Sequence, residues 1–567
     1  LLSAGTSGSK LIVSLTLFER GEAANHLRVQ SDNLDQPFDL NKGAKLDLGS
    51  TAKLRTLITY LEIVALLREQ LAGLPPSELK AAAASARDPL TAWVADHLAA
   101  HPEPDLASLL SAAMARRYSA SPWERFFTGG GVHQFANFQA EDNGRIMSVA
   151  DAFRHSVNLV FVRLMRDIVQ YHMAQGTPAE ELLADSQNPL RRAYLERFAD
   201  REGRTFLNQF QGELAGLSPD GALDRLAGQV RPRADRLAVI FRSVRPEADR
   251  AALAELLRAR MPGKSFTERE IDRLYERYGA DRFSLNDRGY IAGVHPLKLW
   301  LVAYWQEHPN PPRAEMLQAS AKERLESYAW LFKISSKAKQ DKRIRILLEE
   351  EAFARIHEAW RRLGYPFEHL VPSYATAIGS SADRPEALAE LIGIVLNDGV
   401  WQPTVRIERL HFAEGTPYET VLGARPTAPR RVLAPEIAVE VRKAMVDVVE
   451  NGAARRLSKS YVTAGGAPLA IGAKTGTGDH RRKSFGRGGR LIGSEVVSRT
   501  ATVVFFLGER LFGNLTIYVP GPEAADFSFT SSLPAQLLKA MAPALQPLID
   551  GSSLRTAEAV IPAEGGA

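Results

Sequence analysis

A serine and a lysine three residues apart, Ser50 and Lys53, are the first residues whose types and spacing could do chemistry. They open residues 46–67, LDLGSTAKLRTLITYLEIVALL, where apolar residues recur at helical spacing after Gly49. Residues three apart share one face of a helix, so the Lys53 amine can reach the Ser50 hydroxyl. A serine needs a neighbouring base to become a nucleophile. A lysine is such a base when burial or a nearby cation lowers its pKa.

The S-x-x-K pattern is weak evidence by itself. Ser7 and Lys10 have the same spacing, as do Ser336 and Lys339. The ordinary alternative for Lys53 is a solvated lysine on a helix. Other residues must therefore decide whether the pair is catalytic.

A second group of polar residues, Ser156 and Asn158, lies in a short loop that we expect between two helices within residues 148–164. A hydroxyl and an amide at this spacing could hydrogen-bond a peptide substrate or a lysine. Ser-x-Asn is a common sequence, however, and most copies of it are turn or cap residues.

A third group, Lys474 to Thr477, ends an apolar stretch, LAIGAKTGTG, which predicts a strand. A lysine and the two hydroxyls of Thr475 and Thr477 on a strand edge make a receptor for a carboxylate. Gly476 between them keeps side-chain bulk away, so that a substrate can lie along the edge. The alternative is a strand-to-turn transition with incidental polar residues.

Composition limits the possible functions of the 567 residues, of which 45% are hydrophobic and 24% charged. These values are typical of globular proteins, and the length predicts about three or four domain-sized units. The chain has no cysteine, which excludes disulfides, thiolate catalysis and cysteine metal sites. No motif indicates a metal, a nucleotide cofactor or nucleic acid. The net charge of +5 fits an anionic surface such as a cell wall or membrane.

No apolar run approaches the roughly 20 residues of a membrane span. Because the sequence begins with Leu1, we expect a fragment or a processed form that has lost a signal peptide or membrane anchor.

In this order, S-x-x-K, S-x-N and K-T-G resemble the transpeptidase domain of penicillin-binding proteins, in the serine acyltransferase group that includes serine β-lactamases. The chain resembles the C-terminal half of a bifunctional, class A-like peptidoglycan synthase. The flanking segments are also similar to this family: FDLNKGAKLDLGSTAKL, MSVADAFRHSVNLVFVRL, YATAIGSSADRPEALAELIGIVLNDGVWQPT and VRKAMVDVVENGAARRL. The resemblance covers roughly residues 11–61, 133–164 and 371–549. Leu54 follows Lys53 where the family more often has proline.

The resemblance implies an α/β (α+β) fold, with an antiparallel sheet between helices on both faces and mostly helical insertions. The site is expected between the strand ending at Lys474 and the helix starting at Ser50. We expect the basic, glycine-rich residues 479–490 to form a mobile loop. The expected divisions are a linker, residues 1–9; three transpeptidase parts, residues 10–74, 132–164 and 369–550; helical insertions, residues 75–131 and 165–368; and a disordered tail, residues 551–567.

For the catalytic residues, the resemblance implies that Ser50 attacks the carbonyl between two D-alanines of a peptidoglycan stem peptide. Lys53 accepts the proton of Ser50. Ser156 relays a proton to the leaving amine, with Lys474 nearby. Asn158 hydrogen-bonds the substrate backbone and holds Lys53.

For substrate binding, the resemblance implies that Thr475 and Thr477, on either side of Gly476, hold the terminal carboxylate. The backbone N–H groups of Ser50 and Thr477 form the oxyanion hole. Neither a metal nor a cofactor is implied. The implied partners are stem peptides as acyl donor and amine acceptor, β-lactams as inhibitors, and cell-wall synthesis proteins bound by the helical insertions. The implied location is the periplasm or the outer face of the cytoplasmic membrane.

Two alternatives stay open from the sequence. A D,D-carboxypeptidase or a β-lactamase-type hydrolase uses the same acyl-enzyme and differs in its acceptor, which is water. A non-catalytic cell-wall scaffold would use the helical insertions to bind partners. A glycosyltransferase domain usually precedes this domain in bifunctional members of the family, and none is recognisable here.

Overall fold

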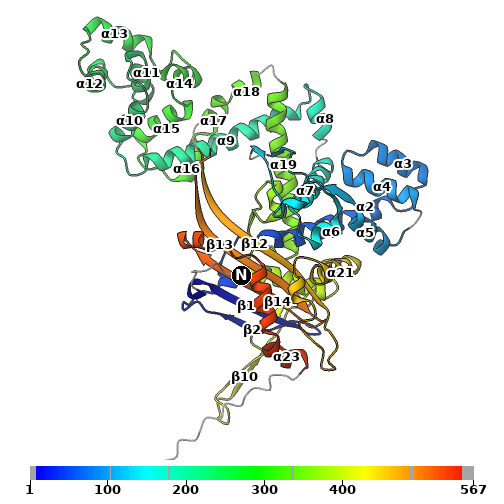
Figure 1. Cartoon of the computed structure of the whole chain (residues 1–567). Helices are drawn as coiled ribbons and strands as arrows, with labels where there is room; N and C mark the ends of the chain where they lie inside the picture. The colour runs from blue at the N-terminus through cyan, green and yellow to red at the C-terminus, as the bar shows by residue number, and fades with distance from the viewer. Residues whose placement is uncertain are drawn as a thin grey trace, which may run out of the picture. The chain divides into compact units, whose positions relative to one another are not determined.

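The computed structural model describes residues 8–101, 104–128, 131–176, 179–333, 337–485 and 491–551 (Figure 1). The chain divides into two compact units, one formed by Leu1–Pro178 and Glu349–Ala567 and the other by Ala179–Leu348. Most of the expected linker, residues 1–7, and nearly all of the expected tail, residues 552–567, lie outside the described residues.

A six-stranded sheet forms the centre of the first unit, in the order β12-β13-β14-β1-β2-β8. The neighbouring pairs from β12 to β2 are antiparallel, and β8 pairs parallel with β2. The expected antiparallel sheet is thus extended by one short parallel strand. The strands are β1 (Ile12–Arg20), β2 (Asn25–Asp32), β8 (Thr404–Val405), β12 (Ile471–Phe485), β13 (Leu491–Leu507) and β14 (Leu511–Pro520).

Both faces of this sheet are covered. Every residue from 501 to 507 in β13 is buried, and successive side chains of a strand point to opposite faces. Helices α20 (Pro385–Leu396) and α21 (Pro435–Asn451) contact β14 and β12, and α22 (Ser532–Ala540) contacts β13 and β14. The structure therefore confirms the predicted class, a sheet between layers of helices.

Strand β12 is longer than the sequence predicts. It continues to Phe485, which pairs with Leu491 of β13. The loop expected at residues 479–490 is therefore wrong for residues 479–485, while residues 486–490 lie outside the described part. Lys474 is the fourth residue of β12 and does not end it. Residues 479–484, DHRRKS, have no apolar face, and their strand hydrogen bonds come from pairing with β13, so local sequence carries little signal for a strand.

The expected insertion at residues 75–131 shares the core of the first unit. Its buried residues Leu90, Val94 and Leu109 belong to one hydrophobic cluster with Leu57 and Phe161. The helices of this region are α2 (Ala52–Leu71), α3 (Pro76–Ser85), α4 (Pro89–Ala100), α5 (Leu106–Ala115), α6 (Val149–Arg154) and α7 (Asn158–Ala174). Its short strands are β3 (Arg117–Ser119), β4 (Phe126–Thr128), β5 (Gly131–His133) and β6 (Ile146–Ser148).

Shorter elements complete the first unit. They are η1 (Gly8–Lys10), α1 (Leu40–Gly43), η2 (Gly49–Thr51), η3 (Ala140–Asp142), η4 (Tyr374–Ile378), β7 (Val400–Trp401), β9 (Arg409–Phe412), β10 (Thr420–Gly423), β11 (Arg430–Arg431), η5 (Arg455–Leu457), η7 (Pro522–Asp526) and α23 (Ala542–Ile549).

The second unit is helical and has its own core, which includes Leu207, Phe210, Ile240 and Trp305. Its helices are α8 (Ala179–Ala184), α9 (Leu190–Leu214), α10 (Pro219–Gly228), α11 (Ala234–Val244), α12 (Arg250–Arg260), α13 (Glu268–Arg277), α14 (Leu285–Ala292), α15 (Pro296–Glu307), α16 (Arg313–Ala319), α17 (Ala321–Ser327), α18 (Trp330–Lys333) and the first part of α19 (Lys337–Arg362).

This unit is shorter than the expected insertion at residues 165–368. Ile168 of α7 and Trp360 of α19 belong to the core of the first unit. The second unit ends at Leu348, inside the continuous helix α19, so helical periodicity does not mark that change of core. At the other end, α7 stops at Ala174, and Gly176 and Pro178 follow it in the sequence as a helix-stop signal.

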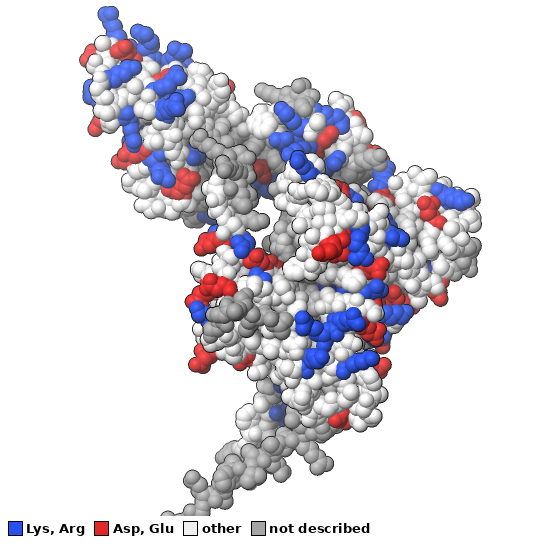
Figure 2. Space-filling view, viewed as in Figure 1, with Lys and Arg blue, Asp and Glu red and all other residues white. Residues whose placement is uncertain are grey.

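Charged side chains of both signs are interspersed on the face shown in Figure 2, in keeping with a net charge of +5. Among the described residues, no helix combines the length and the apolar character needed to cross a membrane.

Candidate active site

Ser50 lies in η2, a single 3-10 turn directly before α2. Gly49 has φ 53°, and a Cβ at this residue would lie 2.1 Å from the carbonyl oxygen of Thr477. A Cβ at Gly476 would lie 2.0 Å from the carbonyl oxygen of Leu48. Both positions therefore require glycine, because the backbone of the turn packs directly on the backbone of β12.

Lys53 is fully buried in the first turn of α2 and is surrounded by oxygen atoms. Its Nζ lies 2.8 Å from Ser50 Oγ, 2.7 Å from Asn158 Oδ1, and 2.6 Å and 3.2 Å from the carbonyl oxygen and Oγ of Ser156. Desolvation by burial puts the pKa of Lys53 well below its usual value, and the positive charge of Lys474 lowers it further. A neutral amine at this position can accept the Ser50 proton.

Lys474 is also fully buried, and its Nζ lies 2.9 Å from Ser156 Oγ and 3.1 Å from the Thr475 carbonyl oxygen. Burial lowers the pKa of Lys474 to about 7. Ser156 Oγ therefore contacts the amines of both lysines. This geometry suits a hydroxyl that passes a proton between them.

The loop between α6 and α7 places Ser156 and Asn158. Ser156 adopts φ 60°, in the left-handed region that non-glycine residues seldom occupy. Asn158 is the first residue of α7, and its Nδ2 donates to the Ala136 carbonyl oxygen at 3.0 Å. Its Oδ1 remains directed at Lys53. The Asn158 amide therefore ties the lysine to the neighbouring chain segment.

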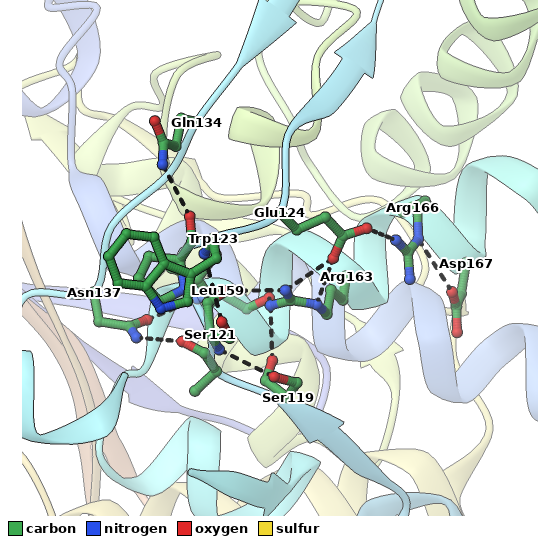
Figure 3. Close-up of polar contacts among 12 residues, drawn as sticks. Ser119, Ser121, Trp123, Glu124, Gln134, Asn137, Leu159, Arg163, Arg166 and Asp167 are labelled. Carbon is green, nitrogen blue, oxygen red and sulfur yellow. Dashed lines mark hydrogen bonds and ion pairs between the residues drawn. The ribbon is translucent and has the colours of Figure 1, made fainter. Parts of the chain in front are cut away.

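Asn137 fixes the segment that faces this loop (Figure 3). Its Oδ1 accepts from the Leu159 N–H at 3.0 Å, at the start of α7. Its Nδ2 donates to the Ala120 carbonyl oxygen at 2.8 Å and to Asn143 Oδ1 at 3.0 Å. No local sequence pattern marks Asn137. Its importance follows from contacts with residues far along the chain.

A cleft of about 500 Å³ lies over these residues. The predicted residues that line it are Ser50, Ser156, Asn158, Thr475, Gly476 and Thr477. Lys53 and Lys474 lie beneath this lining, bonded to Ser50 and Ser156. The structure thus brings every sequence-predicted site residue together around one cleft.

Two walls of the cleft were missed by sequence reasoning. One carries Phe138, Glu141, Arg145 and His155. The other is Thr530–Ser532, and the Ser531 N–H donates to Thr477 Oγ1 at 2.9 Å. A Ser and Thr cluster shortly before a helix is typical of helix N-termini, so residues 530–532 had a local signal, although nothing local placed them beside Thr477.

A buried ion pair supports the nucleophile turn from behind. Arg55 Nε lies 2.7 Å from Asp383 Oδ2, and both side chains are buried. The backbone of Asp383 exchanges two hydrogen bonds with Leu46, just before the turn. Desolvation raises the pKa of Asp383 although Arg55 opposes that change. The pair therefore connects α2 to the chain that precedes Ser50.

Scans of protein-family models and of curated proteins find no match to this chain. Solved structures do match. The penicillin-binding protein PonA1 from Mycobacterium tuberculosis aligns at 13% identity over 96% of this chain and 80% of that chain, with a TM-score of 0.38. A peptidoglycan synthetase from Bifidobacterium adolescentis aligns at 10% identity over 96% and 58%, with a TM-score of 0.37. The D,D-transpeptidase domain of a peptidoglycan glycosyltransferase from Eggerthella lenta aligns at 12% identity over 93% and 78%, with a TM-score of 0.35. These three solved proteins are, by their names, a penicillin-binding protein and enzymes of peptidoglycan synthesis.

Proposed function

We propose that this chain is a penicillin-binding peptidoglycan D,D-transpeptidase that works through an acyl-enzyme on Ser50. One observation carries the proposal: the Nζ of a fully buried lysine, Lys53, lies 2.8 Å from Ser50 Oγ. A lysine whose ammonium is destabilised by burial is a base at neutral pH. The resemblance of the S-x-x-K, S-x-N and K-T-G motifs to the penicillin-binding protein family supports a stem peptide ending in D-Ala-D-Ala as the substrate.

In the acylation step, Lys53 Nζ takes the Ser50 proton as Oγ attacks the carbonyl carbon between the two D-alanines. The C–O bond forms, and the C–N bond to the terminal D-alanine then breaks. The departing amine takes a proton from Ser156 Oγ, which is 2.9 Å from Lys474 Nζ and 3.2 Å from Lys53 Nζ. The proton can therefore return from either lysine to Ser156.

The binding roles follow from the walls of the cleft. Thr475 and Thr477 supply hydroxyls for the terminal carboxylate of the donor, and the Ser531 N–H fixes the orientation of Thr477 Oγ1. The backbone N–H groups of Ser50 and Thr477 hold the oxyanion. Asn158 hydrogen-bonds the donor backbone. The site needs neither a metal nor a cofactor for this chemistry.

In the second step, an amine of a neighbouring stem peptide attacks the ester, forms the cross-link and releases Ser50 with its proton. We place this reaction in the cell envelope, outside the cytoplasmic membrane. β-Lactams would acylate the same serine, and the second, helical unit would offer a surface for proteins of cell-wall synthesis.

The test is the intact mass of the protein after incubation with benzylpenicillin. The native chain should gain one penicillin, and Ser50→Ala should gain none. Ser85→Ala, at an exposed serine of α3, is the matched control and should behave as the native chain. A native chain that gains no mass contradicts the proposal.

A second measurement separates transfer from hydrolysis. With a D-Ala-D-Ala donor and an amine acceptor, a transpeptidase forms amide product at the expense of hydrolysed donor. An adduct that forms and quickly disappears, together with D-alanine release and no amide product, would identify a carboxypeptidase or β-lactamase-type hydrolase instead.

A further inference from the structure

Trp123 is 83% exposed, although a tryptophan side chain is usually packed against other residues. It lies in the turn between β3 and β4, and Figure 3 shows its indole beside the polar network of this region. The proposed acyl transfer gives this residue no role. Its exposure therefore needs a separate explanation.

The turn that carries Trp123 is held firmly in place. Arg163, which is almost fully buried, donates to the carbonyl oxygens of Ser119 at 2.8 Å and Ser121 at 2.9 Å. The same guanidinium lies 2.8 Å from Glu124, which also pairs with Arg166 at 2.5 Å (Figure 3). The residues on either side of the indole are therefore fixed by charged hydrogen bonds. A rigid backbone around Trp123 reduces the conformational entropy that is lost when a ligand packs on the ring.

The turn is also continuous with the cleft. Gln134 Nε2 donates to the Pro122 carbonyl oxygen at 3.2 Å, and Asn137 Nδ2 donates to the Ala120 carbonyl oxygen at 2.8 Å. The next residue, Phe138, is 71% exposed and lines the cleft that contains Ser50. Two exposed aromatic rings thus lie on two hydrogen-bonded segments, one of which forms the cleft wall.

We propose that Trp123 and Phe138 form a carbohydrate-binding subsite that holds a sugar ring of the glycan strand from which the stem peptide extends. This inference rests on the proposed function and specifies its substrate as glycan-linked peptide. A pyranose ring has an apolar C–H face that packs on an indole, and hydroxyls around its edge that need polar partners. The side chains of Gln134 and Glu124, beside the Trp123 turn, are polar partners of this kind. The adjoining β4–β5 hairpin also exposes Phe127 (64%) and Val132 (55%), so a protein is the competing ligand that the test separates. The continuity of the Trp123 turn with the cleft favours the glycan, because the stem peptide in the cleft extends from it.

The test compares two donors with Trp123→Ala: uncross-linked glycan strands that carry D-Ala-D-Ala stem peptides, and the same pentapeptide without sugars. The half-saturating concentration of the glycan-linked donor should rise about three- to tenfold, the effect of one aromatic stacking contact. The ratio of this concentration to that of the free peptide should rise by the same factor. Trp123→Tyr, which keeps an aromatic face, should recover most of the loss.

Tyr290→Ala is the matched control, because Tyr290 is an equally exposed aromatic residue, 89% exposed, in the second unit. It should leave the ratio unchanged. Binding of glycan strands stripped of their peptides should weaken in Trp123→Ala and not in Tyr290→Ala. An unchanged ratio, or equal losses for both donors, would overturn the sugar subsite and point to a protein ligand or a structural role. The penicillin adduct on Ser50 is measured in the same variant, so failure of the acyl-enzyme proposal is recognised separately.

Discussion

Lys474→Met should make the protein more stable at neutral pH while it removes a residue of the site. Burial lowers the pKa of Lys474 from 10.5 to about 7. At pH 7 the unfolded chain binds the Lys474 proton tightly, whereas the folded site binds it only weakly. This difference lowers the unfolding free energy by roughly 4 kcal/mol. Methionine has a similar length and no charge, and it would pack near Phe153, whose ring centre lies 5.5 Å from Lys474 Nζ.

The substitution also removes hydrogen bonds to Ser156 Oγ and to the Thr475 carbonyl oxygen. Each contributes about 1 kcal/mol. The expected net gain in unfolding free energy at pH 7 is therefore about 2 kcal/mol, the difference between the relieved protonation penalty and the two lost hydrogen bonds.

The sign of this effect should change with pH. Because the folded pKa lies below the unfolded pKa, the unfolded chain binds more protons between pH 7 and pH 10.5, and the unfolding free energy of the native chain rises with pH in that window. Near pH 10 the penalty from Lys474 falls to about 1 kcal/mol, below the roughly 2 kcal/mol of hydrogen bonds. The methionine variant should then be the less stable protein.

Differential scanning calorimetry of both proteins at pH 7 and pH 10 measures this crossover. Lys80→Met, the same substitution at an exposed lysine of α3, is the control for the general effect of removing a positive charge. A stability difference between Lys474→Met and the native chain that is the same at both pH values would refute the reasoning, as would a variant that is less stable at pH 7.

Three further predictions test other parts of the site. The rate of acylation by benzylpenicillin should rise with pH through a lysine pKa well below 10.5, because Lys53 must lose its proton to act as a base; a rate that does not change from acid to alkaline pH contradicts this role. Gly476→Ala should slow acylation at least about 100-fold, because the new methyl group would collide with the Leu48 carbonyl oxygen and displace the nucleophile turn from β12. Stopped-flow acylation by a chromogenic β-lactam measures the rate. A native-like rate would show that this contact can relax. Arg55→Met should lower the unfolding free energy by about 3 kcal/mol, since it leaves the Asp383 carboxylate buried without its ion-pair partner. Urea unfolding measures the loss, and adding Asp383→Asn should recover part of it. No recovery would show that the loss has another cause.

The sequence predicted the parts of the site that depend on short-range patterns. The helix after Ser50 has apolar residues at helical spacing, and the Lys474 strand is bounded by apolar residues and glycine. The capping box of Thr267 and Glu270 at the start of α13 is a short-range pattern of the same kind. In each case the residues that determine the element are neighbours in the chain.

The cleft walls could not be predicted in this way. Asn137 matters because it bonds Leu159 and Ala120, and Ser531 matters because its N–H bonds Thr477. The end of β12 likewise depends on its pairing with β13. The second unit ends at Leu348, inside helix α19, where the change from one core to another leaves helical periodicity unchanged. These features follow from contacts between distant residues, which one sequence does not display.

The same burial that destabilises the fold is what would make the site reactive. Lys53 and Lys474 are fully buried, and in the described residues the hydrogen-bond partners of their amines are hydroxyl, amide and backbone oxygens, with no carboxylate among them. A carboxylate in contact with Lys53 would stabilise its ammonium and raise its pKa, so that the amine could not accept the Ser50 proton. Neutral oxygen partners orient the amine without holding its proton. The rigid backbone contacts at Gly49 and Gly476 and the buried Arg55–Asp383 pair then have a common purpose: they keep two poorly solvated amines in place where a looser fold would admit water and restore their ordinary pKa.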